Sequence, residues 1–251
     1  MGYILSDDAA IYYEEYGGGP PLILLPGLLG TIENTWRRFV PEFAKCFHTV
    51  VVDLRGHGKT NNPAGTLTIP MLVRDVETLI ETLGFERIFL CGYSLGGYVG
   101  LAYGIENPER VKGLIMHGTK FFWTPEVMKR SCEELNPETL LQSDPERVQE
   151  MRNDHASAGN EERWNGLLET SREFAMRMVA DGIPASSLPR ARFPVLVSIG
   201  ENDRFVPRIE AGELARLLPD ALVKTVPKAG HAMKTVEKEP FLSMTLGFFN
   251  V

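Results

Sequence analysis

The stretch Gly92-Tyr93-Ser94-Leu95-Gly96 reads G-x-S-x-G and is followed at once by a third glycine, Gly97. It joins an apolar run, 87–93, to a segment with helical character, 95–107. A serine in a sharp turn between a strand and a helix needs neighbours without a Cβ atom, because a side chain there would collide with the adjoining backbone. The pattern predicts a nucleophile elbow, the alternative being a glycine-rich turn that happens to contain serine. Such an elbow exposes the hydroxyl of Ser94 and leaves the N–H of Leu95 near an oxyanion.

Short apolar runs alternate with longer amphipathic segments around this elbow. That order is typical of βαβ units about a mainly parallel sheet, so we expect an α/β fold. An antiparallel hairpin is expected at residues 2–5 and 10–16. Helices are expected from Thr68 to Gly84 and over 95–107. Buried strands are expected in six short runs rich in Val, Ile and Leu: 22–25, 49–53, 87–93, 111–116, 195–199 and 221–226.

Residues 120–184 depart from this alternation, because they contain no convincing strand. Thr124-Pro125, Asn136-Pro137 and Asp144-Pro145 each place a proline after a capping residue, which predicts three short helices. A longer fourth helix is expected to begin at Asn160. We therefore expect a helical cap over an α/β core that is formed by residues 1–119 and 185–251.

The composition argues against several classes of protein. The 251 residues include 26 Lys and Arg against 33 Asp and Glu, a net charge of −7, so no basic field favours nucleic acid. No apolar stretch approaches the roughly 20 residues of a membrane helix, so no membrane partner is expected. Residues 1–8 do not have the pattern of a secretory signal. Three scattered cysteines, Cys46, Cys91 and Cys132, predict neither disulfides nor a metal site, which favours the cytoplasm.

The chain resembles the α/β-hydrolase superfamily, in its serine esterase and lipase-like branch, over nearly all of its length. The resemblance rests on the elbow and on Pro26-Gly27-Leu28-Leu29-Gly30, Asp53-Leu54-Arg55-Gly56-His57-Gly58, Gly200-Glu201-Asn202-Asp203 and Gly230-His231. The family order of nucleophile, acid and histidine implies a triad of Ser94, Asp203 and His231. These motifs are specific to the fold and far less specific to a substrate.

Each triad residue has an expected role. Ser94 attacks, His231 is the general base, and Asp203 accepts the Nδ1–H of His231 and stabilises the imidazolium. Asp203 follows an expected strand by a short turn, as such an acid should. An aspartate that only bonds its own turn is the alternative, and Glu201 is the weaker candidate for the acid.

The resemblance also implies an oxyanion hole from the N–H groups of Leu28 and Leu95, beside Gly27. Relatives commonly carry His-Gly where this chain has Pro26-Gly27. His117 at a strand end lines the pocket or is structural, and the run Phe121, Phe122 and Trp123 lines an acyl pocket or packs the cap core.

The remaining chemistry-bearing residues are expected to be structural. His57 is expected to stabilise its loop, Asp53 and Arg55 to form a hydrogen-bonded corner, and His48 and His155 to lie on the surface. Cys91 is expected to be a small buried apolar residue rather than a nucleophile.

The favoured function is hydrolysis of small or medium carboxylic esters through an acyl-enzyme, with no metal or organic cofactor. Nearly the same residues catalyse several related reactions, which remain alternatives: cleavage of thioesters, lactones, amides or C–C bonds, acyl transfer and perhydrolysis. The sequence does not determine the oligomeric state. Haloalkane dehalogenase and epoxide hydrolase relatives place aspartate at the nucleophile position, so Ser94 argues against both. A slow-turnover ligand receptor that uses the cap as a partner surface, and a non-catalytic scaffold, are the alternatives of another class.

Overall fold

The computed structural model describes residues 1–143, 145–156 and 161–250. Its sheet has the strand order β1-β2-β4-β3-β5-β6-β7-β8. The pairs β1–β2 and β2–β4 are antiparallel, and the others are parallel, which confirms the predicted α/β fold and its N-terminal hairpin. The strands are β1 Gly2–Ser6, β2 Ala9–Tyr16, β3 Pro21–Leu25, β4 His48–Val52, β5 Ile88–Tyr93, β6 Val111–His117, β7 Val195–Gly200 and β8 Ala221–Val226.

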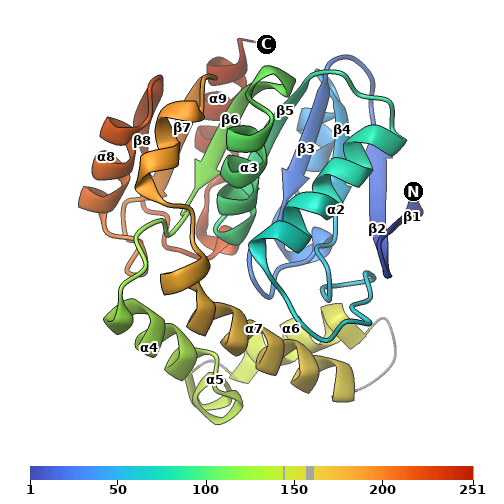
Figure 1. Cartoon of the computed structure of the whole chain (residues 1–251), viewed down its shortest axis with the longest axis vertical. Coiled ribbons are helices and arrows are strands. Elements are labelled where there is room, and N and C mark those ends of the chain that lie inside the picture. Colours follow the sequence, from blue (N-terminus) through green and yellow to red (C-terminus); the bar gives the residue numbers. More distant parts are fainter. Residues whose placement is uncertain (144, 157–160, 251) are drawn as a thin grey trace.

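Helices cover both faces of this sheet, and successive strand residues point to opposite faces. Ile23 and Leu25 pack on one side with α2 (Ile69–Thr82), α3 (Leu95–Glu106) and α8 (Arg208–Leu217). Leu22 and Leu24 pack on the other side with η1 (Ile32–Trp36), α1 (Val40–Phe43) and α9 (Lys238–Phe249). Figure 1 shows α2 and α3 crossing in front of the strands. The buried strands thereby hold their carboxyl ends in one fixed row.

Local signals set the element boundaries. Thr68 caps α2, because its Oγ1 accepts a hydrogen bond from the Met71 N–H at 3.3 Å. Gly84, with φ +69°, follows the end of that helix as predicted. The prediction that 221–226 is a buried strand is wrong, because β8 pairs only with β7 at the edge of the sheet. Its Leu222 and Val223 are 54% and 41% exposed.

Four helices lie together at one end of the sheet (Figure 1): α4 Pro125–Glu134, α5 Pro137–Ser143, α6 Pro145–Ala156 and α7 Glu161–Asp181. Thr124 caps α4 through the Val127 N–H at 3.3 Å, and Asn136 Oδ1 accepts from the Glu138 N–H at 2.9 Å. The predicted helix starts at Asp144 and Asn160 lie outside the described residues. The short helices are η2 Pro108–Arg110, η3 Ala185–Arg190 and η4 Met233–Thr235. Among the described helices, none combines the length and the apolar character that a bilayer crossing demands.

A buried ion pair ties the N-terminal hairpin to α2. The Arg55 side chain is completely buried and donates to both carboxylate oxygens of Asp75, at 2.8 and 2.9 Å. It also donates to Asp8 Oδ1 at 2.5 Å and to the Ser6 carbonyl at 3.1 Å. Asp53 bonds other groups, so the predicted corner of Asp53 and Arg55 consists of two separate networks.

We expect Arg55→Met to lower the free energy of unfolding by about 3–5 kcal/mol, because it leaves the Asp75 carboxylate buried and unpaired. Burial already raises the pKa of Asp75 above its ordinary value, against the opposing effect of Arg55. Urea unfolding measures the loss. The matched control is Arg74→Met, which removes an exposed pair with Glu77 and should change stability little. Equal effects of the two variants would show that the buried pair has no special role.

Candidate active site

The G-x-S-x-G stretch forms the predicted sharp turn between β5 and α3. Ser94 has φ 50° and ψ −114°, a conformation that residues with a side chain rarely adopt. A Cβ atom added to Gly92 would lie 2.3 Å from the Gly96 carbonyl carbon, and one added to Gly96 would lie 2.2 Å from the Leu25 oxygen. The Ser94 N–H donates to the His117 carbonyl at 2.8 Å. The turn thus excludes side chains on both sides of Ser94 and is anchored to β6.

Asp203 and His231 meet at the carboxyl ends of β7 and β8. Asp203 Oδ2 lies 2.9 Å from His231 Nδ1, and Oδ1 accepts the N–H groups of Phe205 and Val206, each at 2.9 Å. Burial alone would raise the pKa of Asp203, but these hydrogen bonds hold it below its ordinary value. The ionised carboxylate fixes the proton of His231 on Nδ1, so Nε2 is left as the acceptor. Glu201 bonds the Lys228 N–H at 2.8 Å instead.

Ser94 and His231 line one cavity of about 600 Å³ between the core and the four helices. Residues 1–119 and 185–251 contribute Leu28, Leu29, Leu95, Tyr98, Asn202, Arg204, Phe205, Ala232 and Thr235. The helical side contributes Lys120, Trp123, Arg130, Ser131, Glu134, Leu135, Thr139, Leu140, Met151, Phe174, Ala175 and Met178. The helical side is mainly apolar, whereas polar side chains cluster beside His231.

The loop after β3 presses against the elbow. A Cβ atom added to Gly27 would lie 3.2 Å from Ser94 Cβ and 2.9 Å from the Tyr93 ring, so glycine permits this approach. The Gly30 N–H closes a turn onto the Gly27 carbonyl at 2.9 Å. Leu28 and Leu95 lie on the cavity wall, whereas Gly27 is not part of it. The two leucines predicted to donate their N–H groups are therefore both adjacent to Ser94 at the cavity.

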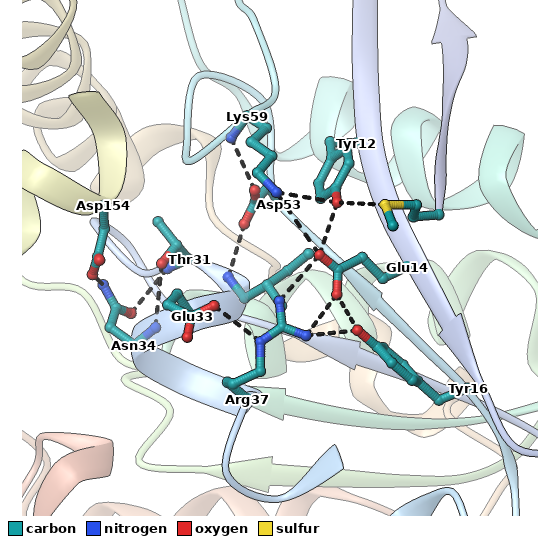
Figure 2. A network of polar contacts seen from close by, with 12 residues as sticks. Tyr12, Glu14, Tyr16, Thr31, Glu33, Asn34, Arg37, Asp53, Lys59 and Asp154 are labelled. Atoms are coloured by element: carbon teal, nitrogen blue, oxygen red, sulfur yellow. Dashed lines mark hydrogen bonds and ion pairs between the residues drawn. The ribbon is translucent and has the colours of Figure 1, made fainter. Parts of the chain in front are cut away.

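A polar network, which Figure 2 shows, fixes η1 directly after that loop. The buried Asp53 accepts the Ile32 N–H at 2.8 Å and the Lys59 N–H at 2.9 Å. Burial raises the pKa of Asp53 to about 6. At the other end of η1, Arg37 pairs with the buried Glu14 at 2.7 Å. The loop between β3 and η1 is therefore held at its far end as well as at the elbow.

Only one of four further residues predicted for the pocket lines the cavity, namely Trp123. Phe121 and Phe122 are not part of its wall and pack with the core, and their N–H groups donate to Glu210 Oε1 at 2.9 and 3.1 Å. His117 is completely buried, with Nδ1 3.0 Å from Ser198 Oγ, and burial lowers its pKa to about 4. For His117, Phe121 and Phe122 the pocket-lining prediction is corrected in favour of core packing.

The other histidines are also settled by their surroundings. His155 is 1% exposed, with Nδ1 2.7 Å from the Met151 carbonyl, so the prediction of a surface residue is wrong. Its ring centroid lies 5.9 Å from that of His57, which bonds the Arg55 carbonyl within its own loop. His48 is half-buried beside Glu15. The packing of α6 and α7 buries His155. No local sequence pattern indicates this packing, which explains why the surface prediction for His155 is wrong.

Sequence reasoning missed several cavity residues, among them Arg204, Tyr98 and Met151. Arg204 directly follows Asp203 in the sequence, and this position is a usable signal for its place at the cavity. Met151 comes from a helix whose orientation no motif specifies. Cys91 is buried as expected, and burial raises the pKa of its thiol. Within the described ranges, no three His, Cys, Asp or Glu side chains gather as a metal site would require.

Comparison with known proteins agrees with this fold. Residues 20–173 match the family model described as alpha/beta hydrolase fold. A protein of Azorhizobium caulinodans named as a carbamate hydrolase is 28% identical over 99% of this chain and 98% of its own length. A 2-hydroxy-6-oxononadienedioate/2-hydroxy-6-oxononatrienedioate hydrolase of Paraburkholderia phymatum is 27% identical over 95% of this chain and 90% of its own. The enol-lactonase of Burkholderia xenovorans LB400 has a similar structure, with a TM-score of 0.80 at 21% identity, over 99% of this chain and 100% of that chain.

We expect a fluorophosphonate probe to label Ser94, because its strained elbow exposes the hydroxyl on a cavity wall that it shares with His231. Ser94→Ala should abolish labelling as measured by intact-protein mass spectrometry. Ser131→Ala is the matched control, since Ser131 lines the same cavity on α4. Labelling that survives in Ser94→Ala but disappears in Ser131→Ala would contradict the assignment.

Proposed function

The chain belongs to the alpha/beta hydrolase fold family, and on this premise we propose that it hydrolyses small and medium carboxylic esters through an acyl-enzyme. One observation carries the proposal. Ser94, at φ 50° on the elbow, and His231, bonded to Asp203 at 2.9 Å, line the same cavity. A nucleophile, a base and an orienting acid are the parts that acyl transfer needs.

In the first half-reaction, Ser94 Oγ forms a bond to the acyl carbon of the ester while His231 Nε2 takes the serine proton. The N–H groups of Leu28 and Leu95 hold the developing oxyanion. The C–O bond to the alcohol then breaks, and His231 gives its proton to the departing oxygen. The acyl group is left on Ser94 and the alcohol leaves.

In the second half-reaction, water attacks the acyl carbon while His231 Nε2 accepts one of its protons. Collapse of the oxyanion breaks the bond to Ser94 Oγ, and the proton returns to that oxygen from His231. The net change is one ester and one water converted to one acid and one alcohol. The side chains of Ser94 and His231 carry the protons that move in these two half-reactions, and Asp203 orients His231.

We assign substrate selection to the cap, residues 120–184, and the chemistry to the core formed by 1–119 and 185–251. The apolar wall of the cap accepts the acyl chain, and it includes Trp123 and Met178. A cavity of about 600 Å³ is within the range of small-molecule sites, which supports acyl groups of medium size. The free cysteines Cys46, Cys91 and Cys132 support a reducing, cytoplasmic setting.

A carbamate is the second candidate substrate. The similarity to the Azorhizobium caulinodans protein, which spans nearly the full length of both chains, favours this candidate. Ser94 would attack the carbonyl carbon of a carbamate in the same way. The slow-turnover receptor differs from both enzymes in one respect, since its acyl-enzyme would persist.

The experiment that tests the function is a series of 4-nitrophenyl esters of increasing acyl length, with matched 4-nitrophenyl carbamates, assayed beside Ser94→Ala. We expect multiple turnovers on the esters, and loss in Ser94→Ala to a residual rate of the order of 10³ over water. Faster turnover of the carbamates would favour the second candidate. A burst of one equivalent followed by almost no release would favour the receptor.

We expect Asp203→Asn to lower kcat by about 10⁴, because the amide can present N–H to Nδ1 and hold the wrong tautomer of His231. In the unmodified protein, kcat/KM for a non-ionising ester should fall toward acid pH, since protonation of His231 removes the base. Asp203 does not cause that fall, because its pKa is held below its ordinary value and it stays ionised. Glu201→Gln is the control. Near-normal kcat in Asp203→Asn would place the acid elsewhere.

A further inference from the structure

The charged side chains on the cavity wall have a positive net charge, whereas the net charge of the whole chain is negative. Lys120, Arg130 and Arg204 face only one acidic lining residue, Glu134, in a chain of net charge −7. A cationic wall in an acidic protein favours an anionic group on the substrate.

Two of these three cations are already neutralised. The Lys120 side chain is 10% exposed and pairs with the buried Glu210, and Arg130 Nε lies 2.7 Å from Glu134 Oε1. Arg204 is exposed, and its guanidinium has no hydrogen bond or ion pair to any residue in the ranges that the structure describes. Its donors are therefore available to a ligand in the cavity.

Arg204 lies on the His231 side of this cavity. It directly follows Asp203, and the ring of the next residue, Phe205, has its centroid 5.0 Å from that of His231. The neutral polar side chains nearby already bond backbone carbonyl groups: Asn202 Nδ2 donates to the Lys228 carbonyl, in the loop after β8, at 3.1 Å. Thr235 Oγ1 donates to the Ala232 carbonyl at 2.7 Å. Arg204 is thus the side chain here with unused capacity for a charged partner.

The position of Arg204 on the His231 side of the cavity indicates which part of the substrate it would contact. In the proposed reaction His231 gives its proton to the departing oxygen, so the alcohol lies beside His231 and the acyl chain lies toward the apolar cap. We propose that Arg204 is a specificity-determining residue that binds a carboxylate on the alcohol part. The substrate class is then an ester of a hydroxycarboxylic acid with an apolar acyl group, an inference that rests on the proposed function.

The physical basis is the match between a guanidinium and a carboxylate, which can form two parallel charge-assisted hydrogen bonds. Hydrolysis of such an ester forms the Ser94 acyl-enzyme, releases the hydroxycarboxylate with its oxygen protonated by His231, and then releases the acyl group as an acid. Arg204 contacts the anion in the ground state, so its loss should act mainly through KM.

The test compares three esters: O-butyryl glycolate, its neutral isostere O-butyryl glycolamide, and monomethyl glutarate, whose carboxylate lies on the acyl part. We expect Arg204→Gln to lower the ratio of kcat/KM for the glycolate ester to that for the glycolamide ester by about tenfold. Arg208→Gln is the matched control, because Arg208 begins α8 and is not part of the cavity wall. That control should leave the ratio unchanged.

Added salt should lower the same ratio in the unmodified protein and have little effect on it in Arg204→Gln. Equal changes in the two glutamine variants would overturn the proposal. So would a selective loss of monomethyl glutarate hydrolysis in Arg204→Gln, because the anion would then lie on the acyl part.

Binding gives an independent test that needs no turnover. In Ser94→Ala protein, calorimetry should show O-butyryl glycolate bound about tenfold more weakly when Arg204→Gln is added. Unchanged binding would overturn the role of Arg204. Failure of the unmodified protein to hydrolyse any of the three esters, with the binding difference intact, would count against the proposed function instead.

Discussion

The backbone of Ser94 is held at φ 50° and ψ −114°, and much of the molecule serves to keep it there. Such a conformation costs of the order of 1–3 kcal/mol and persists only where the surroundings over-determine it. Here β5 and α3 hold the two ends of the turn, and the His117 carbonyl on β6 binds the Ser94 N–H at 2.8 Å. Gly92 and Gly96 allow the chain to pack within this space. The rigid parallel sheet therefore keeps the Ser94 hydroxyl group exposed at the turn.

The segment of η1 and α1 links the other two loops of the site. Asp53 fixes its start through the Ile32 N–H at 2.8 Å, next to the loop that contains Leu28. Arg38 donates to the Met233 carbonyl at 2.7 Å and also to the Val236 carbonyl, just after His231. One short piece of chain therefore connects the proposed oxyanion loop to the loop that carries His231, the proposed base. Helix α6 contacts the same segment where Asn34 donates to Asp154 at 2.8 Å.

The sequence was sufficient for the order of the elements, because glycine turns, helix caps and short apolar runs each act locally. It also pointed to Ser94, Asp203 and His231, since each follows a strand in a recognisable turn. It could not predict the cavity wall, because the backbone at Phe121 and Phe122 is held by Glu210, about ninety residues away. The burial of His155 likewise depends on contacts between α6, α7 and the core. Such errors arise where packing over long sequence distances decides the outcome.

Three fully enclosed imidazoles, those of His57, His117 and His155, have a consequence for the environment that the protein tolerates. Burial lowers their pKa values to about 3, 4 and 4, whereas a histidine in an unfolded chain titrates near 6.5. Below about pH 6.5 these histidines bind protons in the unfolded chain but stay neutral in the folded protein. The free energy of unfolding therefore falls as the pH falls. Asp53, Asp75 and Asp154, whose pKa values burial raises, act in the opposite sense. The lowered pKa values of Glu14 and Asp203 act in the same sense as those of the histidines. The fold is suited to near-neutral surroundings, and acidification drives it toward unfolding through the histidines first.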